Sequence, residues 1–515
     1  MNPSRTVPSG LFLQSRLMKI KTRKFFSALW MGLLTLYTPL VSRGGTEKKP
    51  NVLFLAIDDL RPQTAAYGKA FMKTPHMDRL AAEGRLFQKH YVPVPTCAAS
   101  RYGLLTGQLP YLPESFGNNA FDIAERGEAP PSFPKWFRDH GYYTVQTGKV
   151  THSPDGYEWR RDGFQYFRTG DTLQIPGAWD ELITPAGKWE TPWFSFFGYD
   201  CGDTRRAGYH PPMESVDVDD QGYPDALLAD EAVAQLALLA EREEPFLYAV
   251  GFYKPHLPFT APQKYWDLYD RDEIELTNVD LSRRGGGEFW SYAHSRNDLD
   301  DPNYARDLHH GYYASVSYVD AQVGKVLDAL DELGLSENTI VVLWGDHGYH
   351  LGERGHWGKH TPYEYSMRSA FIVRTPGMKR AGEATEAVTG SVDIYPTLVE
   401  LAGLPKPAHL DGTSFAAVLD DPDADPVGFA LGFWENHITL RNAQYRLVDS
   451  RLYETAIDPT EENDLSNQHP EVFNAMRDQR DALLAARMAA QPPPEKIDHC
   501  NATTDTDDHI EYAPQ

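Results

Sequence analysis

Residues 51–59 read Asn-Val-Leu-Phe-Leu-Ala-Ile-Asp-Asp, an apolar run that ends in two carboxylates. An uninterrupted run of this kind predicts a strand that is buried on both faces, as the strands of parallel sheets are. In open sheets of alternating strands and helices, ligands collect at the carboxyl ends of the strands. The stretch therefore predicts an α/β fold with a polar site at the end of this strand.

A second strand with an acidic end is expected near residue 340. Thr339 to Trp344 form an apolar run that leads into Gly345-Asp346-His347-Gly348. A helix over 224–241 and then a strand over 246–250 continue the alternation that is typical of α/β folds. Two strands that end in carboxylates point to one shared site. Helices are also expected over 74–83, 133–139, 316–334 and 391–403, and a short strand over 142–146.

The acidic ends of these two strands supply candidate metal ligands. Asp58, Asp59 and Asp346 offer carboxylates, and His347 offers an imidazole. Oxygen-rich sites favour Ca²⁺ or Mg²⁺, whereas a zinc site would recruit more histidine or thiolate. The pair Asp58-Asp59, taken alone, is more often a turn or a helix cap.

Length and charge limit the class of protein. The chain has 515 residues, which is long for a single core and favours two domains or subdomains. Its formal net charge of −24 argues against a nucleic-acid or anionic-membrane surface. An anionic substrate would need a local basic pocket.

The N-terminal segment has the layout of an export signal. Lys19, Lys21, Arg23 and Lys24 precede the apolar run from Phe25 to Val41. This order predicts a secretory signal peptide over 1–45 and a secreted or periplasmic protein without stable membrane association after cleavage. A retained membrane anchor is the alternative, and Met18 is an alternative start to Met1.

The C-terminal part predicts a smaller α+β subdomain. Residues 404–426 are rich in proline and aspartate and look like a connector, and 428–455 alternate as short antiparallel strands do. A helix is expected over 470–487. These limits divide the chain into a catalytic domain over 46–403, a subdomain over 404–490 and a disordered tail over 491–515.

Two segments predict long loops. Residues 153–222 and 281–302 have little periodicity, and long loops of this kind often shape clefts. Their tryptophans could stack on a ligand ring, but packing within the loops is the more ordinary role. These are Trp159, Trp179, Trp189, Trp193 and Trp290.

Cys97 lies where a helix is expected to begin. Val92-Pro93-Val94-Pro95 cannot continue a helix, whereas 100–105 favour one that Gly107 ends. A cysteine just before a helix N-terminus lies near free N–H groups that favour an anion. A buried structural thiol is the ordinary interpretation. With only three cysteines no disulfide framework is expected, and pairing of Cys201 with Cys500 stays open.

Three short clusters join a lysine to a histidine after an apolar run. They are Lys149 with His152, Lys254 with His256, and Lys359 with His360. Each would ordinarily be a solvated loop. Their recurrence in an acidic protein favours a site for an anion.

Taken together, these motifs resemble those of the type I sulfatases, the formylglycine-dependent members of the alkaline phosphatase superfamily. The signature Cys-x-(Pro/Ala)-Ser-Arg-x-x-x-Leu-Thr-Gly is matched by Cys97, Ala99, Ser100, Arg101, Leu105, Thr106 and Gly107. Alanine at 99 replaces the commoner proline, a form that the maturation enzymes of the family also accept. The pattern is most similar to that of the iduronate-2-sulfatases over 58–62, 147–152, 254–259, 313–320, 346–348 and 393–398.

The resemblance implies a fold and a cofactor. It implies an alkaline-phosphatase-like core, with a large, mostly parallel mixed sheet between helices and a smaller antiparallel sheet in the C-terminal subdomain. A maturation enzyme would oxidise Cys97 to formylglycine, whose hydrate attacks sulfur. The expected cation is Ca²⁺, with Mg²⁺ less favoured, and its ligands would be Asp58, Asp59, Asp346, His347 and modified Cys97.

The resemblance also implies roles for the basic residues. Arg101 would orient the formylglycine, and Lys149 and Lys359 would bind sulfate oxygens. His152 would assist proton removal from the hydrate, and His256 would protonate the leaving alcohol.

The implied activity is hydrolysis of a sulfate ester on a sugar or polysaccharide. The alternative is a phosphodiesterase or phosphonate monoester hydrolase of the same superfamily, which can share the Cys97 signature. A non-catalytic binding protein with the same fold is disfavoured, because every candidate ligand and catalytic group is present.

Overall fold

The computed structural model describes residues 48–162, 165–204, 211–282 and 300–490. The predicted signal peptide and C-terminal tail lie outside these residues, as do Cys500 and Trp290. In the part of the chain that is described, no helix is both long and apolar enough to span a bilayer.

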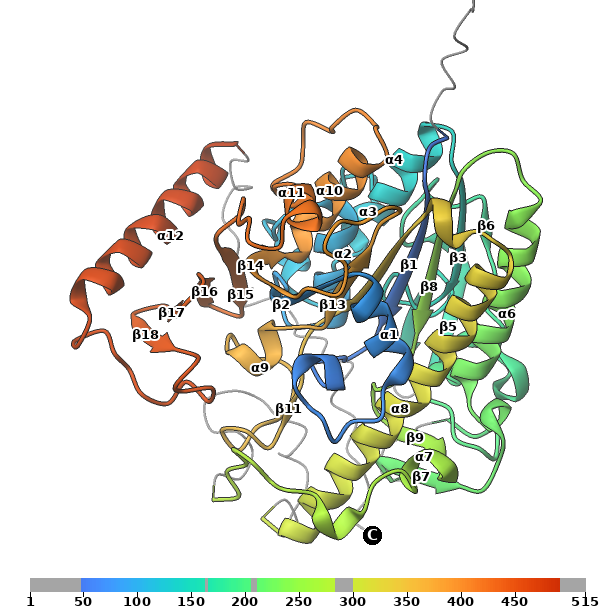
Figure 1. Cartoon of the computed structure of the whole chain (residues 1–515), viewed down its shortest axis with the longest axis horizontal. Coiled ribbons are helices and arrows are strands. Elements are labelled where there is room, and N and C mark those ends of the chain that lie inside the picture. The colour runs from blue at the N-terminus through green and yellow to red at the C-terminus, as the bar shows by residue number, and fades with distance from the viewer. Residues whose placement is uncertain (1–47, 163–164, 205–210, 283–299, 491–515) are drawn as a thin grey trace, which may run out of the picture. The chain divides into compact units, whose positions relative to one another are not determined.

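An eight-stranded mixed sheet forms the centre of the protein (Figure 1). Strands β10 (Thr339–Gly345), β1 (Asn51–Ile57), β8 (Phe246–Phe252), β3 (Tyr143–Gly148) and β6 (Glu181–Leu182) are parallel neighbours. β13 (Phe371–Arg374) is antiparallel to β10 and to β2 (Arg85–Tyr91). β14 (Thr385–Gly390) then pairs in parallel with β2. In spatial order the strands are β14, β2, β13, β10, β1, β8, β3 and β6.

The predicted strand over residues 51–57 is confirmed as β1, at the centre of this sheet. All seven of its residues are buried because helices cover both faces. Leu53, Leu55 and Ile57 pack in a core with α1 (Pro75–Glu83), α6 (Pro224–Ala240) and α8 (Pro302–Glu332). Alternate residues of β1 face the opposite core, with α2 (Cys97–Thr106), α4 (Phe133–Asp139) and α10 (Ile394–Leu401).

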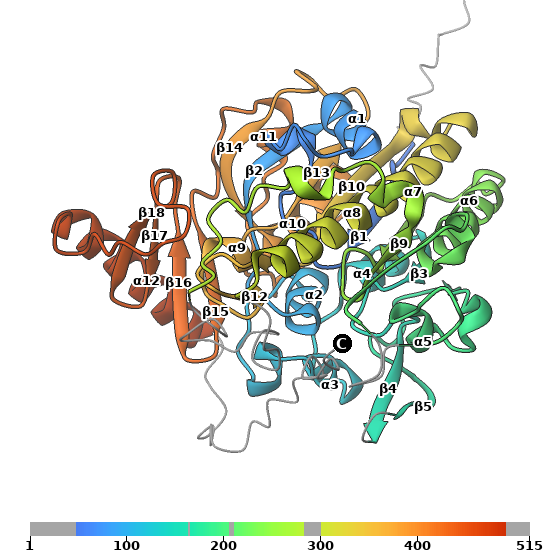
Figure 2. The same cartoon turned by 90° about the horizontal axis from the view of Figure 1, so that it is seen from below.

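The C-terminal sheet is antiparallel, as predicted (Figure 2). It consists of β15 (Ala430–Trp434), β16 (His437–Arg441), β17 (Tyr445–Val448) and β18 (Arg451–Glu454), and α12 (Pro470–Ala490) follows it. Phe433, Leu440 and Leu447 join the core on the α2 side of the central sheet. The expected connector over 404–426 contains a short helix, α11 (Ala416–Asp420). The domain limits at 45, 403 and 490 stay predictions.

The segment over 153–222, expected as loop, contains short regular elements. A hairpin pairs β4 (Tyr157–Asp162) with β5 (Gln165–Leu173), and β7 (Met213–Val216) pairs with β9 (Phe259–Pro262). Trp179, Trp189 and Trp193 are buried, so these side chains pack inside the protein. The remaining short elements are α3 (Asp122–Glu125), α5 (Pro192–Phe196), α7 (Gln263–Trp266), α9 (Glu364–Met367), β11 (His350–Leu351) and β12 (Trp357–Gly358).

Candidate active site

The two acidic strand ends meet because β1 and β10 are parallel neighbours in register. Ile57 lies opposite Gly345, so Asp58-Asp59 and Asp346-His347 leave the sheet side by side. The amide of Asp59 donates a hydrogen bond of 2.8 Å to Asp346 Oδ1. Asp59 has a φ of 59°, a left-handed backbone that few non-glycine residues adopt. The chain therefore turns sharply at its second carboxylate.

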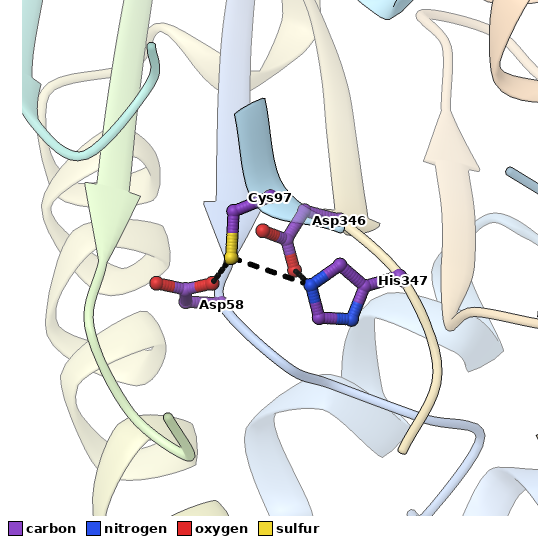
Figure 3. A group of neighbouring side chains, drawn as sticks. All are labelled: Asp58, Cys97, Asp346 and His347. Carbon is purple, nitrogen blue, oxygen red and sulfur yellow. Dashed lines mark hydrogen bonds and ion pairs between the residues drawn. The ribbon is translucent and has the colours of Figure 1, made fainter. Parts of the chain in front are cut away.

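Cys97 reaches the same point from the N-terminus of α2 (Cys97–Thr106). Its Sγ atom lies 3.4 Å from Asp58 Oδ1 and 3.4 Å from His347 Nε2 (Figure 3). Cys97 is the first residue of α2, whereas the sequence predicted a position just before the helix. No proline follows residue 95, so nothing prevents the helix from beginning at Cys97. Thr96 is the extended residue that immediately precedes the helix. Gly107 ends α2 in a left-handed conformation, as predicted.

Four predicted metal ligands form one buried cluster. The ligand atoms of Asp58, Cys97, Asp346 and His347 all lie within 4.8 Å of one another. An overlapping set joins Cys97 to Asp59 and His256. The buried Oδ2 atom of Asp59 accepts no hydrogen bond among the described residues. An orphaned carboxylate oxygen beside two further carboxylates fits a hard cation such as Ca²⁺.

Three buried cations surround the cluster. Lys149 Nζ lies 2.6 Å from Asp58 Oδ2, and Lys359 Nζ lies 3.0 Å from Asp59 Oδ1 and 2.9 Å from Cys97 Sγ. Arg101 Nε donates to Asp346 Oδ2 at 2.9 Å. Its Nη1 donates to the carbonyl oxygens of Lys149 and Val150. These cations face the place where a charged group would bind at Cys97.

The two candidate proton carriers lie differently. His256 belongs to the set with Asp59 and Cys97, and its Nδ1 lies 2.6 Å from the carbonyl oxygen of Leu257. The ring of His152 packs edge-on against Trp193 with centroids 6.0 Å apart. His152 belongs to neither ligand set. The structure thus places His256 beside Cys97 and leaves His152 outside both sets.

Burial and mutual repulsion shift the pKa values of the cluster. Burial raises the pKa of Asp59 to about 8 and raises that of the Cys97 thiol well above its usual value. Burial also raises the pKa of Asp346, but the charges of His347 and Arg101 outweigh it, so the net shift is downward. Burial lowers the pKa of His347 to about 4, which keeps a lone pair on its imidazole at neutral pH.

Sequence patterns did not identify two supports of the site. Tyr312 on α8 donates its hydroxyl to the carbonyl oxygen of Asp59 at 2.7 Å and accepts the amide of Arg61 at 3.2 Å. Trp434 of β15 stacks on His360 with ring centroids 4.8 Å apart. A buried tyrosine implies some hydrogen-bond partner, but its identity depends on contacts that are remote in sequence.

Comparison with known families and proteins agrees with this geometry. The family model described as Sulfatase matches residues 50–404, and the one described as N-sulphoglucosamine sulphohydrolase, C-terminal, matches residues 352–492.

The chain belongs to the sulfatase family.

It is therefore a sulfuric ester hydrolase, and the predicted family is confirmed.

Iduronate 2-sulfatases are among its similar relatives. The protein from Mus musculus is 30% identical over 405 residues, which cover 71% of this chain and 71% of the relative. The one from Homo sapiens is 29% identical over 433 residues, which cover 75% and 76%. The iduronate-2-sulfatase-like pattern of the motifs is thereby confirmed.

Solved structures share the fold. A protein in complex with its substrate D-glucosamine-2-N,6-O-disulfate has a TM-score of 0.64 at 20% identity and covers 87% of this chain and 100% of its own. The phosphonate monoester hydrolase of Agrobacterium radiobacter has a TM-score of 0.68 at 21% identity, with coverage of 85% and 96%. The predicted fold class is confirmed.

Proposed function

We propose that this sulfatase hydrolyses a sulfate ester on a sugar or polysaccharide, with Cys97 as the precursor of its nucleophile. The position of Cys97 carries the proposal, since its Sγ lies 3.4 Å from Asp58 and from His347 and 2.9 Å from Lys359. Burial that raises its pKa argues against a simple thiolate nucleophile. The sugar substrate is inferred from the iduronate 2-sulfatase relatives and from the neighbour that binds a glucosamine disulfate.

A maturation enzyme would convert Cys97 to formylglycine, and the ligand cluster would hold Ca²⁺. As its hydrate, the aldehyde supplies one hydroxyl that attacks sulfur and a second whose loss of a proton releases sulfate. Bound Ca²⁺ supplies positive charge that orients the nucleophile and the sulfate group. Asp58, Asp59, Asp346 and His347 would hold the ion together with residue 97.

The basic residues would act on the sulfate group itself. Lys149 and Lys359 are buried, so their charges act with little screening on the sulfate oxygens. Arg101 is tied to Asp346 and to the backbone at 149–150, which would fix the orientation of residue 97. These contacts support transition-state stabilisation by charges that are already in place.

Two histidines would move protons. His256 lies beside Cys97, and the hydrogen bond of its Nδ1 with Leu257 O would orient the ring that protonates the leaving alcohol. His152 would take the proton from the hydrate when sulfate is released.

The proposal is tested by mass spectrometry of the peptide that contains Cys97. Protein made with the maturation enzyme should carry the aldehyde and be active, and protein made without it should carry the thiol and be inactive. A fully active protein with an unmodified thiol would overturn the mechanism. The variant Cys97→Ala controls for contaminating sulfatases.

A second candidate is a phosphodiesterase or phosphonate monoester hydrolase, because a phosphonate monoester hydrolase shares this fold. Saccharides with 2-O-, 3-O-, 4-O- or 6-O-sulfate, together with one phosphodiester, form the deciding substrate panel. The sulfated saccharides should give the higher kcat/KM, and preference for the phosphodiester would favour the second candidate.

Export is also part of the proposal. The basic and apolar N-terminal segment supports a signal peptide and a secreted or periplasmic enzyme. N-terminal sequencing of protein from the periplasm or medium should give a start between the apolar run and Asn51.

A further inference from the structure

A cavity of about 440 Å³ lies next to the metal-ligand loop, and none of the residues assigned to the Cys97 cluster lines it. Its walls come from residues 61–73 after β1, from 268–278, and from α8, Glu353 and Tyr365. This volume is in the range of small-molecule sites. The catalytic proposal gives it no role.

Aromatic rings form one wall of the cavity. Phe71 is 48% exposed, which is unusual for so large an apolar side chain. Its ring centroid lies 5.2 Å from that of Tyr313, which in turn lies 5.7 Å from that of Tyr269. Such a row of rings offers an apolar surface to the C–H face of a sugar ring.

Two cations, Arg61 and Lys69, also line the cavity. Arg61 uses Nε to bond Gln63 and Nη1 to bond Glu353 and the carbonyl oxygen of Tyr349. Lys69 forms no ion pair within the part of the chain that is described, and burial followed by the charge of Arg61 lowers its pKa. Arg61 is paired with Glu353, so Lys69 is the cation that would attract an anion into the cavity.

Carboxylates limit how much negative charge the cavity accepts. Asp270, Glu273 and Glu275 also line it. They would repel a ligand with several anionic groups on this side, but they accept hydrogen bonds from sugar hydroxyls. The lining therefore suits a ring with hydroxyls and one anionic substituent.

The cavity wall is continuous with the catalytic cluster. Arg61 follows Asp59 by two residues, and the hydroxyl of Tyr312 bonds the amide of Arg61 and the carbonyl oxygen of Asp59. A single chain-like ligand would therefore span the catalytic cluster and the cavity.

We propose that this cavity is a subsite for a second sugar unit of the substrate chain, one that carries a single sulfate or carboxylate group. This inference rests on the proposed function, since it takes the substrate to be a saccharide longer than one unit.

Two exposed positions test the subsite without touching the catalytic groups. Lys69→Gln removes a cation, and Phe71→Ala removes the exposed ring. Each should raise KM for a hydrolysed sulfated tetrasaccharide about tenfold and leave kcat unchanged, since Lys69→Gln loses a charged hydrogen bond and Phe71→Ala loses ring contact with the sugar. Hydrolysis of 4-methylumbelliferyl sulfate, which has no second sugar, should not change. Lys379→Gln, a surface lysine paired with Asp420, is the matched control.

Calorimetry separates this proposal from the proposed function. Heparin and chondroitin sulfate tetrasaccharides are titrated into the Cys97→Ala protein with and without Lys69→Gln. Weaker binding of a tetrasaccharide by the double variant supports the subsite, even if the parent enzyme hydrolyses no sulfated sugar. Equal binding with and without Lys69, or no binding of either tetrasaccharide to an intact cavity, overturns it.

Discussion

The ammonium group of Lys359 lies 2.9 Å from the sulfur of Cys97. The same group is 3.0 Å from Asp59 Oδ1, and Lys359 is fully buried. One cation thus contacts both the proposed nucleophile position and a proposed metal ligand. Lys359 reaches this point on the loop after β12, far in sequence from Cys97.

Lys359→Ala should lower kcat for an aryl sulfate by about 10²- to 10³-fold, the usual effect of removing one preorganised group that stabilises transition-state charge. Steady-state kinetics on fully matured protein measure the loss. Lys379→Ala should behave as the parent enzyme. Retention of more than half the parent kcat by Lys359→Ala would contradict the assigned role.

Removal of metal should abolish activity, because the nucleophile at residue 97 and the sulfate group would then lose the divalent charge that orients them. After prolonged chelation, added Ca²⁺ should restore activity, and added Mg²⁺ should restore less of it. The Tm should also rise with Ca²⁺, since an ion at 100 times its Kd adds about 2.7 kcal/mol to the unfolding free energy. Asp59→Asn should need more Ca²⁺ for both effects, whereas Asp420→Asn, an exposed aspartate, should not. Activity that survives chelation together with an unchanged Tm would argue against a metal site.

His256→Ala should affect substrates according to their leaving group, because a general acid matters most for a poor one. Saccharide sulfates, which release an alkoxide, should lose about 10²- to 10³-fold in kcat. Aryl sulfates, which release a more stable phenoxide, should lose far less. Equal losses on both substrate classes would show that His256 acts by some other route.

Trp434→Ala should lower kcat while the protein stays folded. The Trp434 ring stacks on His360, whose φ of 74° is a strained backbone next to Lys359. Loss of the stack would free this turn and misplace Lys359. An aromatic pair contributes about 1.4 kcal/mol, so we expect about a tenfold loss in kcat. Trp434→Phe should retain most activity because it keeps an aromatic face. An unchanged kcat in Trp434→Ala with an intact fold would remove Trp434 from the catalytic argument.

The stability of the protein should depend on His90 in acid. Burial lowers the pKa of His90 to about 3, and both ring nitrogens lie within 3.1 Å of the hydroxyls of Thr389 and Ser391. The unfolded chain takes up a proton below about pH 6.5, while the folded protein does so only near pH 3. The stabilisation is thus complete above pH 6.5 and is lost as pH falls, by about 1.4 kcal/mol per pH unit.

Denaturant unfolding of the parent protein and His90→Gln between pH 6 and 4.5 measures this effect. The variant should be less stable near neutral pH, and its unfolding free energy should fall less steeply in acid. Parallel curves would mean that His90 takes up its proton in the folded state as readily as in the unfolded one.

The centre of the fold could be predicted because its local patterns are strong. Neighbouring residues are enough to predict β1 and β10, which are apolar runs. The same holds for α1, which has a proline at its start and a glycine after its end. β2 and β13 were not predicted, because β2 mixes apolar and charged residues and gains its structure only from distant partners. Pairing at the antiparallel side of the sheet is a tertiary property.

The sequence by itself determined which chemical groups this protein carries to the ends of its strands. Asp58 and Asp346 follow apolar runs, and Cys97 follows a proline-broken segment, all of which is local information. The tertiary structure alone decided that these groups converge, that Lys359 touches Cys97, and that His152 lies outside the ligand sets. The physical reason is that strand register and loop packing set these distances, and both depend on contacts between residues hundreds of positions apart.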